Sequence, residues 1–133
     1  MTENPMVGIV LISHSRALAE GAADVAGQVS GGAVRLVGIG GTDDGRLGTS
    51  ADALAAAVEK VDAGDGVVIL PDLGSSVLTA RAYLAEPDHR ADVVIADAPF
   101  VEGAVAAAVT ASGGASLAEV VQSAEGARGV RKL

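Results

Sequence analysis

The nine residues VGIVLISHS, numbered 7–15, contain the two features on which the interpretation of the whole sequence depends. Residues 7–12 are mostly β-branched and contain no polar side chain, which is typical of a short strand buried on both faces of a sheet. Ser13, His14 and Ser15 follow directly, and a helical pattern begins at the next residue. A single imidazole at such a strand-to-helix turn is a candidate nucleophile.

Three more apolar runs, each followed by a helical pattern, occur along the chain. They predict strands at residues 34–39, 67–70 and 93–96 in addition to the first. The last two helices are expected over residues 100–112 and around 117–124. Strands that alternate with helices form parallel sheets. The sequence therefore predicts an α/β fold, with an open, mostly parallel four-stranded sheet in the order 2-1-3-4 and helices on both faces.

The first helix is expected to turn one stripe of side chains toward the core. The stripe consists of Leu18, Ala22, Val25 and Val29. Small polar residues at the start of a helix accept hydrogen bonds from its free N–H groups, so Ser13 or Ser15 is expected to cap this helix. Thr49 or Ser50 is expected to cap the second helix in the same way.

The composition indicates one domain with a closely packed aliphatic core. With 133 residues the chain is long enough for one sizeable core and too short for two ordinary domains. Residues 1–133 are therefore expected to form a single domain, with a weakly patterned tail at 127–133. Half of the residues are hydrophobic but only 2% are aromatic, so Ala, Val, Leu and Ile must fill the core. That composition suits helices lying on a parallel sheet.

The charge and the lack of cysteine exclude several classes of protein. Asp and Glu outnumber Lys and Arg by 17 to 9, and the net charge of −8 would repel the phosphate backbone of a nucleic acid. A chain without cysteine has no disulfides and no thiolate chemistry, which is consistent with the cytoplasm. Its apolar runs are far shorter than the roughly 20 residues that span a membrane. Neither a nucleic acid nor a membrane is expected as a partner.

The expected strand order brings two distant loops together. In an open parallel sheet, ligands bind at the carboxyl ends of the strands where the strand order reverses, here between the first and third strands. His14 follows the first strand and Asp72 follows the third, so we expect an imidazole and a carboxylate to meet there. A carboxylate that accepts one ring N–H fixes the tautomer and leaves the other nitrogen free to attack. Asp72 is the candidate for that role.

Groups suited to binding a phosphate surround the same edge. Backbone N–H groups at the start of the first helix, and of the helix after Asp72, can bind phosphate oxygens. The expected phosphate-binding residues are Ser15, Thr49, Gly74, Ser75 and Ser76. No metal or cofactor is expected, because the glycine-rich loop at 40–45 lacks the Lys of a P-loop and the carboxylate spacing of an EF-hand.

Several polar residues also have more ordinary interpretations. A single histidine is more often a capping or surface residue than a nucleophile, and on physical grounds alone this alternative stays open for His14. His89 lies in a polar segment without a comparable setting and is expected to be a solvated loop residue. Arg16 and Arg81 are expected to be solvated helix residues, or contacts at the rim of the site for an acidic partner.

Four short motifs occur together, and because of them the chain resembles a known family. They are the segments 10–15, 40–44 with 48–50, 72–76 and 98–103. In this order and spacing they are similar to the mannose-type IIA domain of the phosphoenolpyruvate-dependent sugar phosphotransferase system. Within that family, the chain resembles the branch formed by the phosphotransfer subunit of bacterial dihydroxyacetone kinase. The resemblance covers about residues 7–123, which is nearly the whole chain.

The resemblance implies that His14 is a phosphoryl carrier. It would accept a phosphoryl group from the histidine-containing phosphocarrier protein and pass it to ADP held on the nucleotide-binding subunit of dihydroxyacetone kinase. The chain would then be a phosphotransferase component with a phosphohistidine intermediate, and it would bind neither nucleotide nor sugar by itself. The resemblance also implies a homodimer, and the composition favours the cytoplasm as its location.

Two alternative functions remain open at this point. A mannose-type IIA domain could instead feed a sugar-transporter IIB domain, and the downstream acceptor of the phosphate distinguishes that function from the first. An α/β module could also regulate or bind a ligand without catalysis. In that case His14 would be a structural residue and would never carry phosphate.

Overall fold

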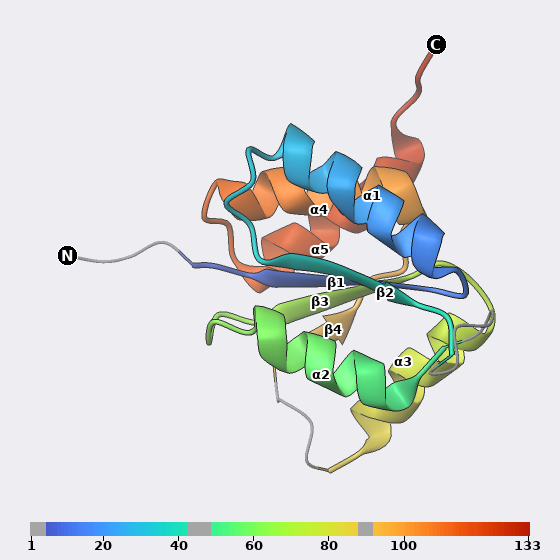
Figure 1. The fold of residues 1–133 in the computed structure, drawn as a ribbon. Coiled ribbons are helices and arrows are strands. Elements are labelled where there is room, and N and C mark those ends of the chain that lie inside the picture. The colour runs from blue at the N-terminus through green and yellow to red at the C-terminus, as the bar shows by residue number, and fades with distance from the viewer. Residues whose placement is uncertain (1–4, 43–48, 88–91) are drawn as a thin grey trace.

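The computed structural model describes residues 5–42, 49–87 and 92–133, and it is built around a central sheet of four parallel strands (Figure 1). In chain order the strands are β1 (Gly8–Ser13), β2 (Leu36–Gly40), β3 (Val67–Pro71) and β4 (Val93–Ile95). They are hydrogen-bonded in the order β2-β1-β3-β4, and each pairing is parallel. The predicted α/β class and strand order are confirmed.

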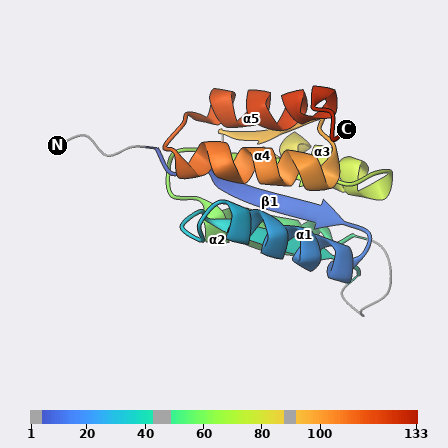
Figure 2. The ribbon, with the colours of Figure 1, turned by 90° about the horizontal axis from the view of Figure 1, so that it is seen from above.

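Helices cover both faces of the sheet, as predicted. They are α1 (Arg16–Val29), α2 (Ala51–Val61), α3 (Ser75–Ala85), α4 (Phe100–Ser112), α5 (Leu117–Gly126) and a final 3-10 turn, η1 (Ala127–Gly129). Helices α1, α4 and α5 lie on one face, and α2 and α3 lie on the other (Figure 1). Seen from above, α4 lies between α1 and α5 (Figure 2). All four strands end at the same edge, which is where α1, α2, α3 and α4 begin.

β1 is buried along its whole length, because both faces of the central strand are covered. Successive side chains of a strand point to opposite faces. Accordingly, Ile9 and Leu11 belong to the apolar cluster shared with α1, α4 and α5, whereas Val10 and Ile12 belong to the cluster shared with α2. The continuous apolar run predicted this burial on both faces correctly.

The predicted buried stripe of α1 is correct for Ala22 and wrong for its other three residues. Leu18, Val25 and Val29 are 44%, 48% and 58% exposed. The buried side chains of α1 are Ala19, Ala22 and Ala26. The reason is the close approach of α1 to β2, since a Cβ atom at Gly38 would lie only 2.3 Å from the carbonyl oxygen of Ala19. Only small side chains fit between elements that pack this closely, so alanines face the sheet.

Local signals set the ends of several helices. Ser50 caps α2 by accepting a hydrogen bond from the N–H of Ala53, as one of the two predicted options. A capping box, which was not predicted from the sequence, joins Ser116 and Glu119 at the start of α5.

The predicted weakly patterned tail begins with the 3-10 turn η1. His89 and part of the loop at 40–45 lie outside the described residues.

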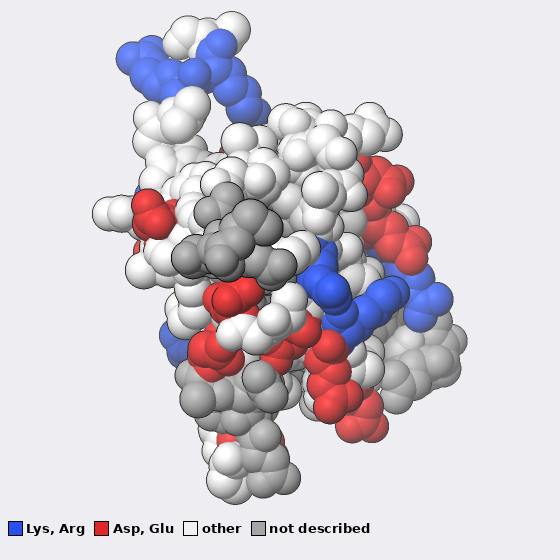
Figure 3. Space-filling model, turned by 90° about the vertical axis from the view of Figure 1, so that its left-hand side faces the viewer, with Lys and Arg blue, Asp and Glu red and all other residues white. Residues whose placement is uncertain are grey.

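Charged side chains of both signs are distributed over the surface. On the face at the amino ends of the strands, basic side chains are interrupted by acidic and neutral ones (Figure 3). This agrees with a chain of net charge −8 whose Lys and Arg residues form no stripe in the sequence. Within the described residues, no helix has the length and apolar character needed to cross a membrane.

Candidate active site

The candidate site lies at the carboxyl ends of β1 and β3, the two strands between which the strand order reverses. In the register of this pair, Ile12 lies opposite Pro71, and the N–H of Asp72 donates to the carbonyl oxygen of Ile12 at 3.0 Å. The residues that follow each strand are therefore neighbours. His14 and Asp72, which are 58 positions apart in the sequence, meet at this point as expected.

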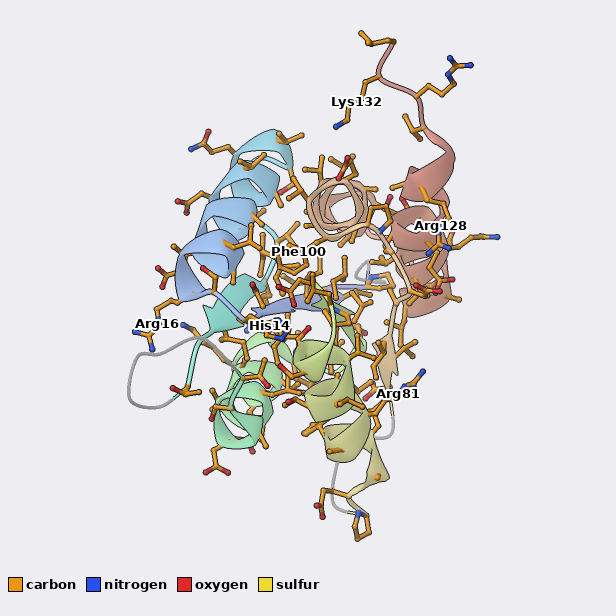
Figure 4. The ribbon with its side chains drawn as sticks, turned by 90° about the vertical axis from the view of Figure 1, so that its right-hand side faces the viewer. His14, Arg16, Arg81, Phe100, Arg128 and Lys132 are labelled. Carbon is orange, nitrogen blue, oxygen red and sulfur yellow. The ribbon has the colours of Figure 1, made fainter. Side chains whose placement is uncertain are left out.

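The imidazole of His14 is held at both nitrogens. Nδ1 lies 3.1 Å from Oδ1 of Asp72, and Nε2 lies 2.6 Å from Oγ of Ser75. The side chain is 29% exposed, so the ring is anchored on one side and reachable from solvent on the other. Figure 4 shows His14 at the centre of the face formed by the carboxyl ends of the strands.

The carboxylate of Asp72 is surrounded by hydrogen-bond donors. Oδ2 accepts from the hydroxyl of Ser13 at 2.8 Å and from the backbone N–H of His14 at 3.3 Å. Oδ1 accepts from the hydroxyl of Ser76 at 2.6 Å and from the backbone N–H of Leu73 at 2.7 Å, in addition to facing the His14 ring. The Asp72 side chain is only 8% exposed.

These contacts determine the charge of Asp72. Burial by itself would raise the pKa of this carboxyl group. The hydrogen bonds from Ser76, Ser13, Leu73 and His14 outweigh burial and lower the pKa from 3.8 to about 2. Asp72 is therefore ionised at any pH at which the protein would function.

The ionised carboxylate decides which ring nitrogen can react. A carboxylate without a proton can only accept hydrogen bonds, so Nδ1 of His14 must carry the ring proton that faces Asp72. In the neutral ring Nε2 then has the free lone pair, and the hydroxyl of Ser75 donates to it. This arrangement suits nucleophilic attack by Nε2, with Asp72 stabilising the positive charge that develops on the ring.

The loop before α3 gives access to Nε2. Gly74 has φ +50°, and a Cβ atom there would lie 3.6 Å from Cε1 and 3.7 Å from Nε2 of His14. A glycine thus leaves open the space in front of the reactive nitrogen. Among the hydrogen bonds of the described residues, none uses the backbone N–H of Gly74 or Ser75. These two donors, at the start of α3, are available to an anion next to Nε2.

Three of the other residues expected to bind phosphate have different contacts. Ser15 caps α1, since its hydroxyl accepts from the N–H of Leu18. The hydroxyl of Thr49 is hydrogen-bonded to that of Thr79 and not to the His14 ring. Ser76 is fully buried, and its hydroxyl faces Asp72. Of the expected set, Gly74 and Ser75 lie against Nε2.

Ser13 is the functional residue that the sequence interpretation missed, because it was considered only as a possible helix cap. It is fully buried, donates to Asp72 and accepts from the N–H of Ser15 at 3.0 Å. A polar residue that ends a strand buried on both faces must find an internal partner. That requirement was the available signal, although it did not identify the partner.

Two arginines lie at the rim of the site. Arg16 is the first residue of α1, and Arg81 lies on α3, where it lines a cavity of about 360 Å³ that Asp72 also borders. Figure 4 shows them on either side of His14. Within the described parts of the chain neither forms an ion pair, whereas Arg128 is paired with Asp97. In the same residues no cluster of three or more His, Asp or Glu side chains is suited to a metal ion.

Comparison with known proteins finds a matching family model and several similar proteins. Residues 8–121 match the model of the EIIA-man family, described as the PTS system fructose IIA component. The chain is 39% identical over 106 residues to the "PEP-dependent dihydroxyacetone kinase 2, phosphoryl donor subunit DhaM" of Listeria innocua, covering 78% of this chain and 85% of the relative.

A longer relative matches as well. The chain is 35% identical over 125 residues to the "PEP-dependent dihydroxyacetone kinase, phosphoryl donor subunit DhaM" of Providencia stuartii, covering 90% of this chain. It spans only 26% of the length of that relative. Among solved structures, the crystal structure of a protein of unknown function is similar with a TM-score of 0.78 and 31% identity, covering 90% of this chain and 92% of the other.

Proposed function

Because this chain belongs to the EIIA-man family of phosphotransferase-system IIA components, we propose that it is a single phosphotransfer domain that carries a phosphoryl group on Nε2 of His14. The family resemblance expected from the four sequence motifs is confirmed. The observation that supports the carrier role most directly is the His14 ring itself. Its Nδ1 faces an ionised carboxylate, its Nε2 has the free lone pair, and the side chain is 29% exposed.

In the first step, the lone pair of Nε2 attacks the phosphorus atom of a phosphohistidine on the histidine-containing phosphocarrier protein. The new N–P bond forms as the N–P bond of the donor breaks, and the electron pair of that bond returns to the donor's ring. The proton on Nδ1 stays in place, so the His14 ring becomes positively charged. Asp72, at 3.1 Å from Nδ1, offsets that charge.

The hydroxyl of Ser75 has a different partner in each state. In the free protein it donates to Nε2 at 2.6 Å. Once Nε2 is bonded to phosphorus it has no lone pair to offer, and the hydroxyl turns to a phosphoryl oxygen. The N–H groups of Gly74 and Ser75 can bind the same oxygens. Among the described residues no lysine or arginine forms a hydrogen bond or ion pair with His14, so these donors can bind the phosphoryl group and still release it to an acceptor.

In the second step, an oxygen of the terminal phosphate of ADP attacks the phosphorus, the N–P bond to His14 breaks and ATP forms. The lone pair returns to Nε2, which regenerates the starting state. We assign ADP on the nucleotide-binding subunit of dihydroxyacetone kinase as the acceptor, because the relatives are named phosphoryl donor subunits of that kinase. Assembly as a cytoplasmic homodimer is part of the same proposal and rests on the family resemblance.

A reconstituted phosphoryl relay tests this function. The protein is incubated with phosphoenolpyruvate, enzyme I and the phosphocarrier protein, and its intact mass is measured. We expect one acid-labile phosphate, absent from His14→Ala, which is drained on adding the ADP-loaded kinase subunit. Phosphate that persists in the His14→Ala variant would refute the carrier role. Drainage by a sugar-transporter IIB domain, and not by the kinase subunit, would assign the chain to the transporter branch.

A further inference from the structure

Two buried serine hydroxyls hold the Asp72 carboxylate, one on each oxygen: Ser13 donates to Oδ2 and Ser76 donates to Oδ1. We propose that Ser13 and Ser76 are positioning residues that keep Asp72 a permanent hydrogen-bond acceptor and thereby determine which nitrogen of His14 is reactive. This inference rests on the proposed carrier function and extends it from the residues that touch phosphate to those that act through Asp72.

The direction of the Ser13 hydrogen bond follows from its second contact. The Ser13 oxygen accepts from the N–H of Ser15 at 3.0 Å, a contact in which a backbone N–H can only donate. The single hydroxyl proton of Ser13 is therefore free to point at Oδ2 of Asp72, 2.8 Å away. Ser13 is the last residue of β1 and is fully buried, so water does not compete for this hydrogen bond.

Ser76 occupies the corresponding place on the other oxygen. It is the second residue of α3 and is fully buried. Its single hydroxyl proton has two acceptors within reach, Oδ1 of Asp72 at 2.6 Å and the carbonyl oxygen of Leu73 at 2.8 Å. The shorter distance and the negative charge favour donation to Oδ1. The Ser76 oxygen accepts from the N–H of Leu73 at 3.2 Å. A side chain enclosed in this way cannot reach a phosphoryl group at Nε2. Positioning Asp72 is the role that its contacts support, in place of the phosphate contact expected from the sequence.

The consequence concerns the proton on the His14 ring. With the serines and the backbone N–H groups of His14 and Leu73 in place, both oxygens of Asp72 accept and neither holds a proton. Nδ1 must then be the donor toward Oδ1. Without the serines, the carboxylate loses two of its four donors other than the ring. Its pKa rises toward the ordinary value, but it stays ionised at pH 8, so the effect on the ring comes from its position. A carboxylate that is held less firmly accepts from Nδ1 less of the time, so the tautomer with the proton on Nε2 gains population. That tautomer cannot attack phosphorus.

The test compares Ser13→Ala, Ser76→Ala and the double variant with the wild type. Ser30→Ala is the matched control. The hydroxyl of Ser30 also donates a hydrogen bond, to the carbonyl oxygen of Gly27, but it lies at the end of α1 far from His14. Two NMR measurements need no partner protein: the ¹⁵N shifts of the His14 ring at pH 8, which report the tautomer, and the titration of the Asp72 carboxyl carbon. The third measurement is the rate of phosphorylation at saturating phosphocarrier protein.

We expect the Nδ1–H tautomer to dominate in the wild type and in Ser30→Ala, and a mixture of tautomers in the double variant. The Asp72 titration should move up by at least about one pH unit in the double variant, and the saturated rate should fall about tenfold or more with little change in KM. An unchanged tautomer and titration in a folded double variant would overturn the proposal. If the double variant does not fold, Ser76→Ala decides, since alanine favours the helix at that position.

The two NMR results separate this inference from the proposed function. If the wild type never becomes phosphorylated, the carrier role fails, whereas the tautomer and the titration still report whether the serines position Asp72. If phosphorylation is normal in the wild type and the serine variants match it in all three measurements, the positioning role fails and the carrier role stands.

Discussion

The hydroxyl of Ser75 lies 2.6 Å from Nε2 of His14, on the side of the ring opposite Asp72. In the proposed cycle this hydroxyl gives up a hydrogen bond to a neutral nitrogen and gains one to a charged phosphoryl oxygen. Hydrogen bonds to charged groups contribute about 1.5–3 kcal/mol, against about 0.5–1.5 kcal/mol for neutral pairs. Ser75 should therefore favour the phosphorylated state by about 1 kcal/mol.

Ser75→Ala should consequently shift the phosphorylation equilibrium back toward the donor by roughly fivefold. The measurement is the phosphorylated fraction at several ratios of phosphorylated to free phosphocarrier protein, read by intact mass. Ser112→Ala is a suitable control, because its hydroxyl donates to the carbonyl oxygen of Val109 at the end of α4. An equilibrium unchanged by Ser75→Ala would mean that the hydroxyl does not follow the phosphoryl group.

Asp72 should make the stability of the protein depend on pH in the acid range. Its pKa is lowered from 3.8 to about 2 in the folded protein, so its contribution is complete above pH 3.8 and is lost as the pH falls toward 2. The contribution is about 2 kcal/mol. The difference in free energy of unfolding between the wild type and Asp72→Asn should therefore shrink by that amount between pH 6 and pH 2, as measured by urea denaturation. A difference that is constant with pH would contradict the assigned hydrogen bonds.

The same substitution should impair catalysis while leaving the fold intact. An asparagine at position 72 retains the shape of the side chain but not the charge that offsets the phosphorylated His14 ring. Loss of the outer partner that orients a metal-binding histidine typically costs 10- to 100-fold, and we take the same range for the partner of His14. We expect the phosphorylation rate of Asp72→Asn to fall within that range at pH 7, and an unchanged rate would show that Asp72 does not assist His14.

Gly74 should be required for access to Nε2 more than for stability. An alanine at this position would put a methyl group 3.7 Å from Nε2, in the space that the phosphoryl group must enter, and would be strained at φ +50°. Gly74→Ala should slow phosphorylation by about tenfold or more. The control is Gly31→Ala, at φ +91° with open space around it, which should lose comparable stability and phosphorylate normally. Equal phosphorylation rates in the two variants would contradict the access role.

The parts of the structure that could be predicted from the sequence are those set by pattern and topology. The apolar run at 7–12 predicted a strand buried on both faces, because such a strand needs no polar alternation. The strand order then placed His14 beside Asp72, since parallel strands end at one edge. Neither inference required knowledge of any side-chain conformation.

The parts that could not be predicted depend on how closely particular elements approach. The sequence stripe of α1 favoured Leu18, Val25 and Val29 as core residues, because hydrophobicity outweighs size in such a pattern. The structure buries alanines instead, since α1 lies too close to β2 for larger side chains. In the same way, Ser13 and Ser76 have partners that depend on hydroxyl directions inside the folded protein.

Gly38 tests this explanation of the α1 packing. A Cβ atom at position 38 would lie 2.3 Å from the carbonyl oxygen of Ala19, and neither backbone can move aside cheaply. Gly38→Ala should therefore destabilise the protein by about 1–3 kcal/mol or more in urea denaturation. Gly21→Ala, on the exposed side of α1 with open space around it, should instead stabilise by about 0.5–1 kcal/mol. A neutral Gly38→Ala variant would show that α1 can lift from the sheet.

Arg16 and Arg81 should promote encounters with the acceptor that carries ADP. They lie on either side of His14 in Figure 4, neither forms an ion pair within the described residues, and the proposed acceptor presents the negative charge of its nucleotide. Arg16→Glu and Arg81→Glu should each slow phosphoryl transfer to ADP by about tenfold at low ionic strength, with the defect shrinking in 0.5 M salt. Arg35→Glu, which makes the same charge change before β2 at the opposite end of the sheet, should have little effect. Equal slowing in all three variants would mean that net charge, and not a local contact, controls the encounter.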